Sequence, residues 1–281
     1  MLPNMPVRLT IVTPSYNQAA FLDETLRSVI DQSKYVHEFF VFDGGSTDGS
    51  VEIIRRHADR IDHWVSEKDG GQSDAIHKGF SRATGDYLLW LNSDDVLLPG
   101  ALERVHAALE AHPEWDAVTG YHVRMDDRSR LISAHRIPGE SAACARWGIH
   151  HTIQQTCFFR RCLYEKVGGL DLSLHCVMDT ELFCRMFDAG SIWGHLPHYQ
   201  AAFRQHGEAK GSSDQWQAKY AEEIAWLSRR SPQYCEVNFK HTLGLMAYRA
   251  DQIISGRYLR ETLDTRRWRG RPLDSIFNPA T

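Results

Sequence analysis

The chain has 281 residues, of which 42% are hydrophobic and 24% are charged, a composition typical of a soluble globular protein. Its formal net charge of -4 gives no reason to expect a nucleic-acid partner. No run of residues reaches the roughly 18 apolar positions that a membrane helix needs, and residues 1–6 do not resemble a signal peptide, so we expect a cytoplasmic protein.

Strand and helix patterns alternate up to residue 123. Short apolar runs predict strands over 7–13, 39–42, 61–65, 87–91 and 116–123. Apolar residues at helical spacing predict helices after the first four strands, over 21–30, 51–54, 73–83 and 101–111. Repeated strand–helix units favour a parallel sheet with right-handed crossovers, and hence a Rossmann-like half.

The pattern changes after residue 123. Residues 124–150 are polar and rich in arginine and histidine, and we interpret them as an irregular surface excursion. Strands are expected over 152–159 and 198–204, with a short glycine-ended helix over 164–169 and a longer helix over 178–187. From residue 214 onward helical patterns dominate, with a break near Ser231 and Pro232.

Each of the first four predicted strands ends in a polar loop. The loops are Thr13–Asn17, Asp43–Ser50, Asp69–Asp74 and Asn92–Asp95. The carboxyl ends of parallel strands meet at one edge of the sheet, where ligands bind, and the clustered carboxylates of the fourth loop suit a divalent cation shared with phosphates. Each loop alone can be explained as turn chemistry or helix capping, but four coinciding loops favour a nucleotide site.

Five segments together resemble family 2 glycosyltransferases: residues 10–24, 43–50, 69–80, 92–99 and 154–185. The resemblance implies an α/β fold of the GT-A class, with a Rossmann-like, mostly parallel central sheet flanked by helices. It also implies a nucleotide-sugar donor, a divalent metal (Mn²⁺ or Mg²⁺) and inversion at the anomeric carbon. We expect a GT-A domain over 1–212, with a nucleotide-sugar half over 7–123 and an acceptor half over 124–212, and then a helical C-terminal extension over 213–281.

The resemblance also implies which residues bind the donor. The nucleotide-sugar residues expected from it are Thr13, Tyr16, Asn17, Asp43, Gln72, Asp74, Lys78, Asn92, Ser93 and Asp94. Tyr16 can stack on a flat base. If Asp43 accepts a hydrogen bond from the base, a pyrimidine with an N3–H fits, so UDP and dTDP sugars are favoured over GDP sugars.

Asn92-Ser93-Asp94 occupies the DxD position of the family, where the last acid meets the metal and the first meets the ribose. Asn92 departs from that pattern, since an amide can bind a ribose hydroxyl but adds no charge for a cation. The expected metal ligands are Asp94, Asp95 and His206, with Asp94 carrying most of the assignment. Asp95 has helix capping as its alternative role, and His206 has a structural or solvent-facing role.

Asp179 matches the acid that family members use as the catalytic base. The preceding residue is Met178, where many members have a glutamate, so Asp179 lacks an acidic neighbour. Trp90, Gln155 and Glu181 are expected on the acceptor side of the site. For Trp90 and Gln155, plain packing is the open alternative.

Together these features predict an inverting glycosyltransferase that moves a sugar to a hydroxyl of a glycan or lipid-linked acceptor in bacterial surface polysaccharide synthesis. Two other classes stay open. The departures at Asn92 and Met178 allow a non-catalytic sugar-binding or scaffold protein on a degenerate transferase fold. A sugar nucleotidyltransferase would also bind a nucleotide and a metal, but the first strand exit lacks the glycine-rich basic loop expected for a triphosphate.

The C-terminal tail over 257–271 is rich in arginine and also carries leucine, tyrosine and tryptophan. It can rest on an anionic membrane surface at the inner face of the membrane, or pack as a solvated helix on the core or on a second subunit of a homo-oligomer. The second interpretation is favoured because Glu261 and Asp264 interrupt the positive charge. The six cysteines show no CxxC spacing and are expected to be reduced, buried thiols.

Overall fold

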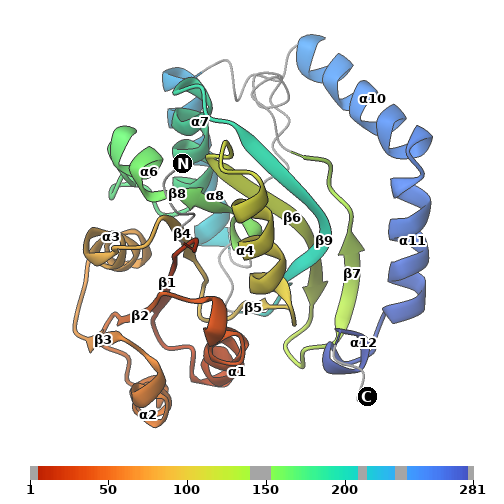
Figure 1. Ribbon diagram of the computed structural model, residues 1–281. Helices are drawn as coiled ribbons and strands as arrows, with labels where there is room; N and C mark the ends of the chain where they lie inside the picture. The colour runs from red at the N-terminus through yellow and green to blue at the C-terminus, as the bar shows by residue number, and fades with distance from the viewer. Residues whose placement is uncertain (1–5, 140–152, 208–213, 232–238, 278–281) are drawn as a thin grey trace.

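The computed structural model describes residues 6–139, 153–207, 214–231 and 239–277 (Figure 1). Within them a mixed sheet runs through the molecule in the strand order β3-β2-β1-β4-β8-β6-β9-β5, and β7 pairs with β6. The strands of the first half are β1 (Leu9–Ser15), β2 (Glu38–Asp43), β3 (His63–Ser66), β4 (Tyr87–Trp90) and β5 (Val96–Leu97). Those of the second half are β6 (Ala117–Met125), β7 (Leu131–His135), β8 (Phe158–Arg160) and β9 (Trp193–Arg204).

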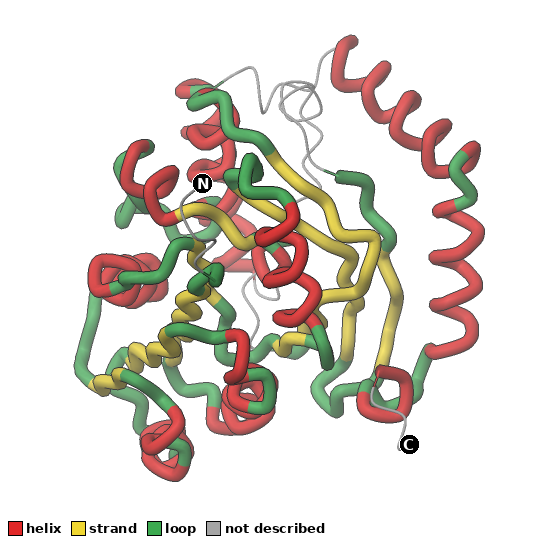
Figure 2. The backbone as a smooth tube through the Cα atoms, in the orientation of Figure 1, coloured by secondary structure: helices red, strands yellow, loops and turns green. Residues whose placement is uncertain are grey.

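Helices cover the sheet and extend along one side of the molecule (Figure 2). Those of the first half are α1 (Ala19–Ile30), α2 (Ser50–Arg56), α3 (Gln72–Arg82) and α4 (Ala101–Ala111). The later helices are α6 (Arg161–Lys166), α7 (Met178–Asp188), α8 (Asp214–Arg230), α10 (Phe239–Ile254), α11 (Arg257–Trp268) and α12 (Asp274–Phe277). Short 3-10 turns are η1 (Ser33–Tyr35), η2 (Ala58–Arg60) and η3 (Gln154–Thr156). No helix of the described ranges is long and apolar enough to cross a membrane.

The first half is the parallel Rossmann-like unit that the sequence predicts. β1 pairs in parallel with both β2 and β4, and β2 pairs in parallel with β3. Every residue of β1 is buried because helices cover both faces of the sheet. Side chains alternate accordingly: Leu9 and Ile11 belong to one apolar cluster and Val12 to the other.

The sheet differs from the parallel pattern expected from the sequence in three places. β8 lies antiparallel between β4 and β6, so the strand over 117–125 is not a direct neighbour of β4. Only the end of the strand expected over 152–159 is a strand, because η3 turns the chain just before β8. The two-residue strand β5, which pairs with β9, was not predicted.

The interpretation of 124–150 as an irregular excursion is wrong for its first part, and 140–152 lies outside the described residues. β6 continues to Met125 and forms an antiparallel hairpin with β7. Leu131 and Ala134 of β7 are buried against Val123 and Met125, so packing makes this polar stretch a strand.

Helix α11 covers the outer edge of β7. The Ala134 N–H donates to Thr265 Oγ1 at 2.9 Å, and the Arg136 N–H donates to Glu261 Oε2 at 2.8 Å. An uncovered edge strand would leave such groups open to pairing with another chain. Helix α11, part of the expected C-terminal extension, therefore covers the exposed edge of the sheet.

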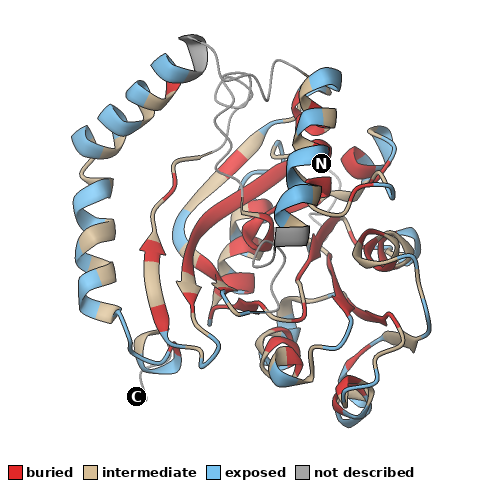
Figure 3. Ribbon diagram, turned by 180° about the vertical axis from the view of Figure 1, so that it is seen from behind, coloured by how far each residue is buried: buried red, intermediate tan, exposed pale blue. Residues whose placement is uncertain are grey.

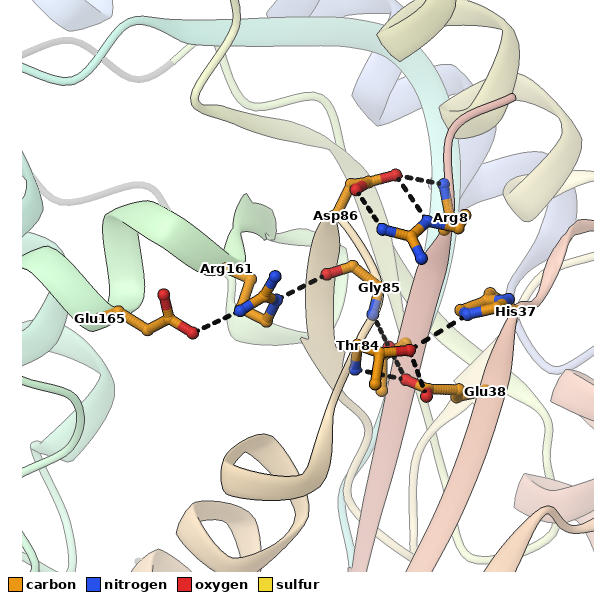
Figure 4. Close-up of polar contacts among 9 residues, drawn as sticks. Arg8, His37, Glu38, Thr84, Gly85, Asp86, Arg161 and Glu165 are labelled. Carbon is orange, nitrogen blue, oxygen red and sulfur yellow. Dashed lines mark hydrogen bonds and ion pairs between the residues drawn. The ribbon is translucent and has the colours of Figure 1, made fainter. Parts of the chain in front are cut away.

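The amino-terminal ends of the strands are closed by polar contacts (Figure 4). Arg8 and Asp86 form an ion pair at 2.9 Å, and Glu38 accepts hydrogen bonds from the hydroxyls of Thr10 and Thr84. The Arg161 side chain also donates to the Gly85 carbonyl. Because these polar groups form hydrogen bonds and ion pairs with one another, we assign a structural role to this edge. The strand exits lie at the opposite edge of the sheet.

The cysteine prediction is confirmed in part. Cys157, Cys162, Cys176 and Cys184 are free thiols, and Cys157 and Cys184 are buried. Cys162 is exposed, contrary to the expectation, because it lies on the outer side of the short helix α6. Cys144 and Cys235 lie outside the described residues.

Candidate functional site

The exit loops of β1, β2 and β3 meet at one point. The Asn17 N–H donates to Ser46 Oγ at 2.8 Å, and the Thr47 N–H donates back to Asn17 Oδ1 at 2.9 Å. A Cβ atom at Gly44 would lie 3.2 Å from Tyr16 Cδ2 and 3.2 Å from Asp69 Oδ1, so the side chains of the first and third loops both pack closely on the second loop. The Tyr16 ring is 63% exposed and is free to receive a flat ligand.

Asp43 is buried and organises the β2 exit loop. Its carboxylate accepts hydrogen bonds from the N–H groups of Gly45 and Ser46 and from the hydroxyls of Ser46 and Ser66. The hydroxyl of Thr13, also buried, has no hydrogen-bond partner among the described residues. An orphan buried hydroxyl costs free energy unless a ligand or water satisfies it.

Asp74 and Lys78 lie on the first turns of α3, beside the β3 exit. Asp74 Oδ2 accepts the Gly70 N–H at 2.9 Å and pairs with Lys78 Nζ at 3.1 Å. The Gly70 hydrogen bond, aided by the Lys78 ammonium, holds the pKa of Asp74 below its usual value. The hydrogen bond with Asp74 in turn raises the pKa of Lys78, whose side chain stays one-third exposed.

Asp94 of the β4 exit loop is in direct contact with the imidazole of His206, which follows β9. Asp94 Oδ2 lies 3.0 Å from His206 Nε2. Both side chains are mostly buried, and the His206 ring packs on Phe21 with centroids 4.7 Å apart. Ser93, between the two polar positions, is buried.

Asp95 is enclosed, which does not fit its prediction as a metal ligand. It is fully buried; Oδ1 accepts the Arg204 N–H at 2.9 Å, and Oδ2 accepts the Gln155 amide at 2.6 Å and the Asn92 amide at 3.3 Å. Burial, together with the charge of Asp94, raises the pKa of Asp95 well above its usual value, against the effect of these hydrogen bonds. With both oxygens occupied, Asp95 supports the loop that presents Asp94.

Asn92 belongs to the same network. Its Oδ1 accepts the Gln72 side-chain amide at 2.6 Å, and its amide nitrogen lies within hydrogen-bond distance of Asp95 and Gln154. An aspartate in its place would offer no donor to the buried Asp95 carboxylate. The departure from the family pattern therefore has a local structural reason.

Arg204, at the end of β9, was not predicted but holds the whole loop. Its fully buried guanidinium donates to the Asp94 carbonyl at 2.8 Å, to Ser129 Oγ at 3.0 Å and to Glu24 Oε2 at 2.6 Å. The hydroxyl of Thr25 binds the Asp95 carbonyl from the opposite side. The loop is thus fixed through its main-chain carbonyls, which accept hydrogen bonds from side chains of β9 and α1.

Asp179 lies in the first turn of α7, half-buried, and its Oδ1 accepts the Thr180 N–H at 2.7 Å. The hydroxyl of Ser73, on α3, lies 2.7 Å from the Leu174 carbonyl and 2.8 Å from Met178 Sδ. Because Ser73 follows Gln72 directly, this contact places the start of α7 next to the Gln72–Asn92 pair. Met178, the other departure from the family pattern, packs at this junction.

Glu223 of α8 caps the segment that leads into α7, and the sequence did not indicate it. Its buried carboxylate accepts the N–H groups of His175, Cys176 and Val177, at distances between 2.8 and 3.1 Å. A carboxylate at a helix amino terminus is stabilised by the helix dipole and the free N–H groups. The C-terminal extension therefore takes part in holding Asp179.

The predicted acceptor-side residues are structural. Trp90 is 1% exposed and packs with Phe80, Phe159 and Phe183, which is the packing role left open as its alternative. Glu181 is also buried, because both of its oxygens pair with Arg185 one helical turn later. Gln155 is buried on Asp95, as described above.

Comparisons with known proteins place the chain among sugar transferases. The sequence model described as Glycosyl transferase family 2 matches residues 10–168. A PGL/p-HBAD biosynthesis glycosyltransferase of Mycobacterium bovis is 30% identical over 197 residues, which is 69% of this chain and 75% of that protein. A putative teichuronic acid biosynthesis glycosyltransferase of Bacillus subtilis, TuaG, is 30% identical over 134 residues, or 46% of this chain and 53% of that protein.

Solved structures share the fold. S. aureus TarS 1-349 in complex with UDP matches with a TM-score of 0.59 and 18% identity, over 78% of this chain and 65% of that chain. The Pyrobaculum calidifontis mannosyltransferase PcManGT, solved with GDP-Man and Mn2+, matches with a TM-score of 0.58 and 19% identity, over 94% of this chain and 85% of that chain. The expected α/β fold, with helices flanking the central sheet as in GT-A transferases, is confirmed.

Proposed function

The chain belongs to glycosyl transferase family 2, and on that premise we propose that it transfers a sugar, with inversion, from a nucleoside-diphosphate donor to a hydroxyl acceptor. The observation that carries the proposal is the convergence of three elements. The first is the exit loops around Gly44, the second is the Asp94–His206 pair, and the third is the start of α7 with Asp179. Each supplies one part of the reaction.

The donor nucleotide would bind over the loops of β1, β2 and β3. The exposed Tyr16 ring offers a stacking surface, and Asn17 joins the first two loops beneath it. Oδ1 of Asp43 accepts a hydrogen bond from the Ser46 hydroxyl. Because this hydroxyl can rotate away, Oδ1 would be able to accept a hydrogen bond from a base N–H. We therefore favour a UDP or dTDP sugar; S. aureus TarS was solved with UDP-GlcNAc, whereas PcManGT was solved with GDP-Man.

Asp94 and His206 would hold a divalent metal, Mn²⁺ or Mg²⁺. Their facing atoms, a carboxylate oxygen and an imidazole nitrogen, are donors that such ions accept. No group of three acidic, histidine or cysteine side chains suited to a metal occurs within the described ranges. Two protein ligands suffice where the diphosphate and water complete the coordination. When bound, the ion would stabilise the charge of the departing diphosphate.

On the protein side, Lys78 lies beside the same edge and can meet a phosphate, while Asn92 and Gln72 can turn to ribose hydroxyls. Asp179 would accept the proton of the attacking hydroxyl, for which the two oxygens must come within roughly 2.6–3.2 Å. One displacement with one base inverts the anomeric centre. A retaining hydrolase would instead need two carboxylates about 5–5.5 Å apart.

The acceptor would be a glycan or a lipid-linked sugar of bacterial surface polysaccharide or glycolipid synthesis. Relatives named for teichuronic acid and for PGL/p-HBAD biosynthesis support that class. A scaffold without activity is the alternative, and it rested on Asn92 and Met178. Both residues have local contacts, Asn92 with Asp95 and Met178 with Ser73, which give each departure a structural reason other than loss of activity.

The proposal is tested by release of nucleoside diphosphate from a panel of UDP, dTDP and GDP sugars, with and without Mn²⁺. We expect one uridine or thymidine donor to be turned over and to raise the thermal midpoint by mass action. Asp59→Asn, an exposed change in η2 away from the strand exits, serves as the matched control. A chain that neither binds nor turns over any donor would leave the scaffold as the correct class.

A further inference from the structure

Helices α10 and α11 lie along one side of the molecule and are largely exposed (Figure 3), and several of their exposed residues are large and apolar. We call this set the outer helical face. Its apolar members, with exposed fractions from 43% to 85%, are Leu243, Met246, Ile253, Ile254, Tyr258, Leu259 and Leu263. On α10, positions 243, 246, 253 and 254 recur at helical spacing, so they line one face of that helix. Soluble surfaces carry scattered apolar residues, but contiguous apolar faces mark contact sites.

The charge of α11 is divided between its two sides. Arg260, Arg266 and Arg267 are exposed next to Leu259 and Leu263, and no described residue forms an ion pair with any of these three arginines. They complete the outer helical face, together with the exposed Arg249 of α10.

The acids of α11 point to the body of the protein instead. Glu261 accepts the Arg136 N–H, and Asp264 Oδ2 binds the Arg136 guanidinium at 2.7 Å and the Tyr199 hydroxyl at 2.7 Å. The sequence suggested that these acids interrupt the positive charge of the tail. In the structure they do not, because both are used inward.

The inner side of helix α11 is bound to the body of the protein. Thr265 and Glu261 bind the edge of β7, and Trp268 packs against Tyr199 and Phe277. These contacts hold the helix in place and leave the arginines and leucines of its outer side exposed. Such an arrangement is a preformed surface for a partner.

We propose that the outer helical face docks peripherally on an anionic lipid bilayer. Exposed leucine and isoleucine side chains enter the interface while the flanking arginines meet anionic headgroups, the combination that membrane-surface helices use. Charge argues against a second copy of this chain, because a two-fold contact through this face would gather the unpaired arginines of both copies in one interface. The inference rests on the surface alone and not on the proposed transfer reaction.

The test is co-sedimentation of the full chain with vesicles of phosphatidylcholine alone and of phosphatidylcholine with phosphatidylglycerol. We expect binding to the second kind only, weakened by added salt. Each arginine near the surface contributes about 1 kcal/mol. The combined variant Arg260→Gln, Arg266→Gln and Arg267→Gln should therefore bind about 100-fold more weakly.

Two further variants complete the test. Ile253→Ser with Leu259→Ser should also release the protein, since it removes apolar insertion without changing charge. Arg55→Gln with Arg56→Gln, two exposed arginines on α2, should bind like the parent. Failure to bind anionic vesicles, or equal binding to neutral ones, overturns the proposal. So does a dimer in sedimentation equilibrium that Ile253→Ser dissociates, because the face would then belong to a second copy.

Discussion

Removing the carboxylate of Glu223 should destabilise the start of α7 and with it the proposed base. The carboxylate is 4% exposed and accepts three consecutive N–H groups, those of His175, Cys176 and Val177. Hydrogen bonds to a charged group contribute about 1.5–3 kcal/mol each, but they share one carboxylate and water can enter after truncation. We therefore expect Glu223→Ala to lower the free energy of unfolding by about 2–4 kcal/mol.

The neighbouring residue is a matched control. Glu222 lies on the same helix with a 73% exposed side chain and a surface contact to Lys219, so Glu222→Ala should cost less than about 0.5 kcal/mol. Urea unfolding followed by circular dichroism gives both values, and release of nucleoside diphosphate should fall in Glu223→Ala alone. Equal unfolding free energies for the two variants, with equal activity, would refute the capping role.

Further predictions concern the loop and the core. Arg204→Met should lower the free energy of unfolding by about 3 kcal/mol, because the buried charge fixes the β4 exit loop that carries Asp94. It should also weaken the proposed metal-dependent donor binding, measured by calorimetry; unchanged binding would contradict this. Gly79→Ala should cost about 1–3 kcal/mol, since its Cβ would lie 2.5 Å from Val12 Cγ1, and Val12→Ala should recover part of the loss in the double variant. Burial, aided by nearby charge, lowers the pKa of His122 to about 3 and that of His135 to about 4. Both histidines are therefore neutral in the folded protein near pH 6, whereas in the unfolded chain they bind protons below about pH 6.5. Stability should therefore fall as the pH drops from 6.5 towards 4, and His122→Phe should reduce that slope by about 1 kcal/mol per pH unit in urea titrations; a parent protein with no such slope would contradict the linkage.

The sequence predicts the first half well because its signals are local. The helix over 101–111 has an amphipathic pattern between Gly100 and Pro113, and the structure has α4 at the same bounds. The first four strands are apolar runs with turn residues at their ends, and each was placed within two residues at either end. Their polar exits meet as expected, because parallel strands end at one edge of the sheet.

The misses are residues and strands whose reasons lie far away in the sequence. Arg204 is 110 positions from Asp94, and Glu223 is 48 positions from His175, so spacing gave no signal for either. β5 has two residues and exists through its pairing with β9. No local propensity separates such a strand from a loop.

Two residues expected on the acceptor side also carry a sequence signal for the structural contacts that they make. Trp90 lies within a continuous apolar run over 87–91, which is typical of a parallel strand buried on both faces. Glu181 has Arg185 four residues later on the same helix, the spacing of an ion pair. Each of these two signals indicates a structural role for the side chain.

The central claim is that Asp94 serves the donor and Asp179 serves the acceptor. It is tested most directly by measuring, in one experiment, Mn²⁺-dependent nucleotide binding and sugar transfer for Asp94→Asn and Asp179→Asn. We predict that Asp94→Asn loses the metal-dependent part of binding, whereas Asp179→Asn keeps it and loses transfer by about 100-fold or more. Full transfer by Asp179→Asn, or unchanged metal dependence in Asp94→Asn, would contradict the account.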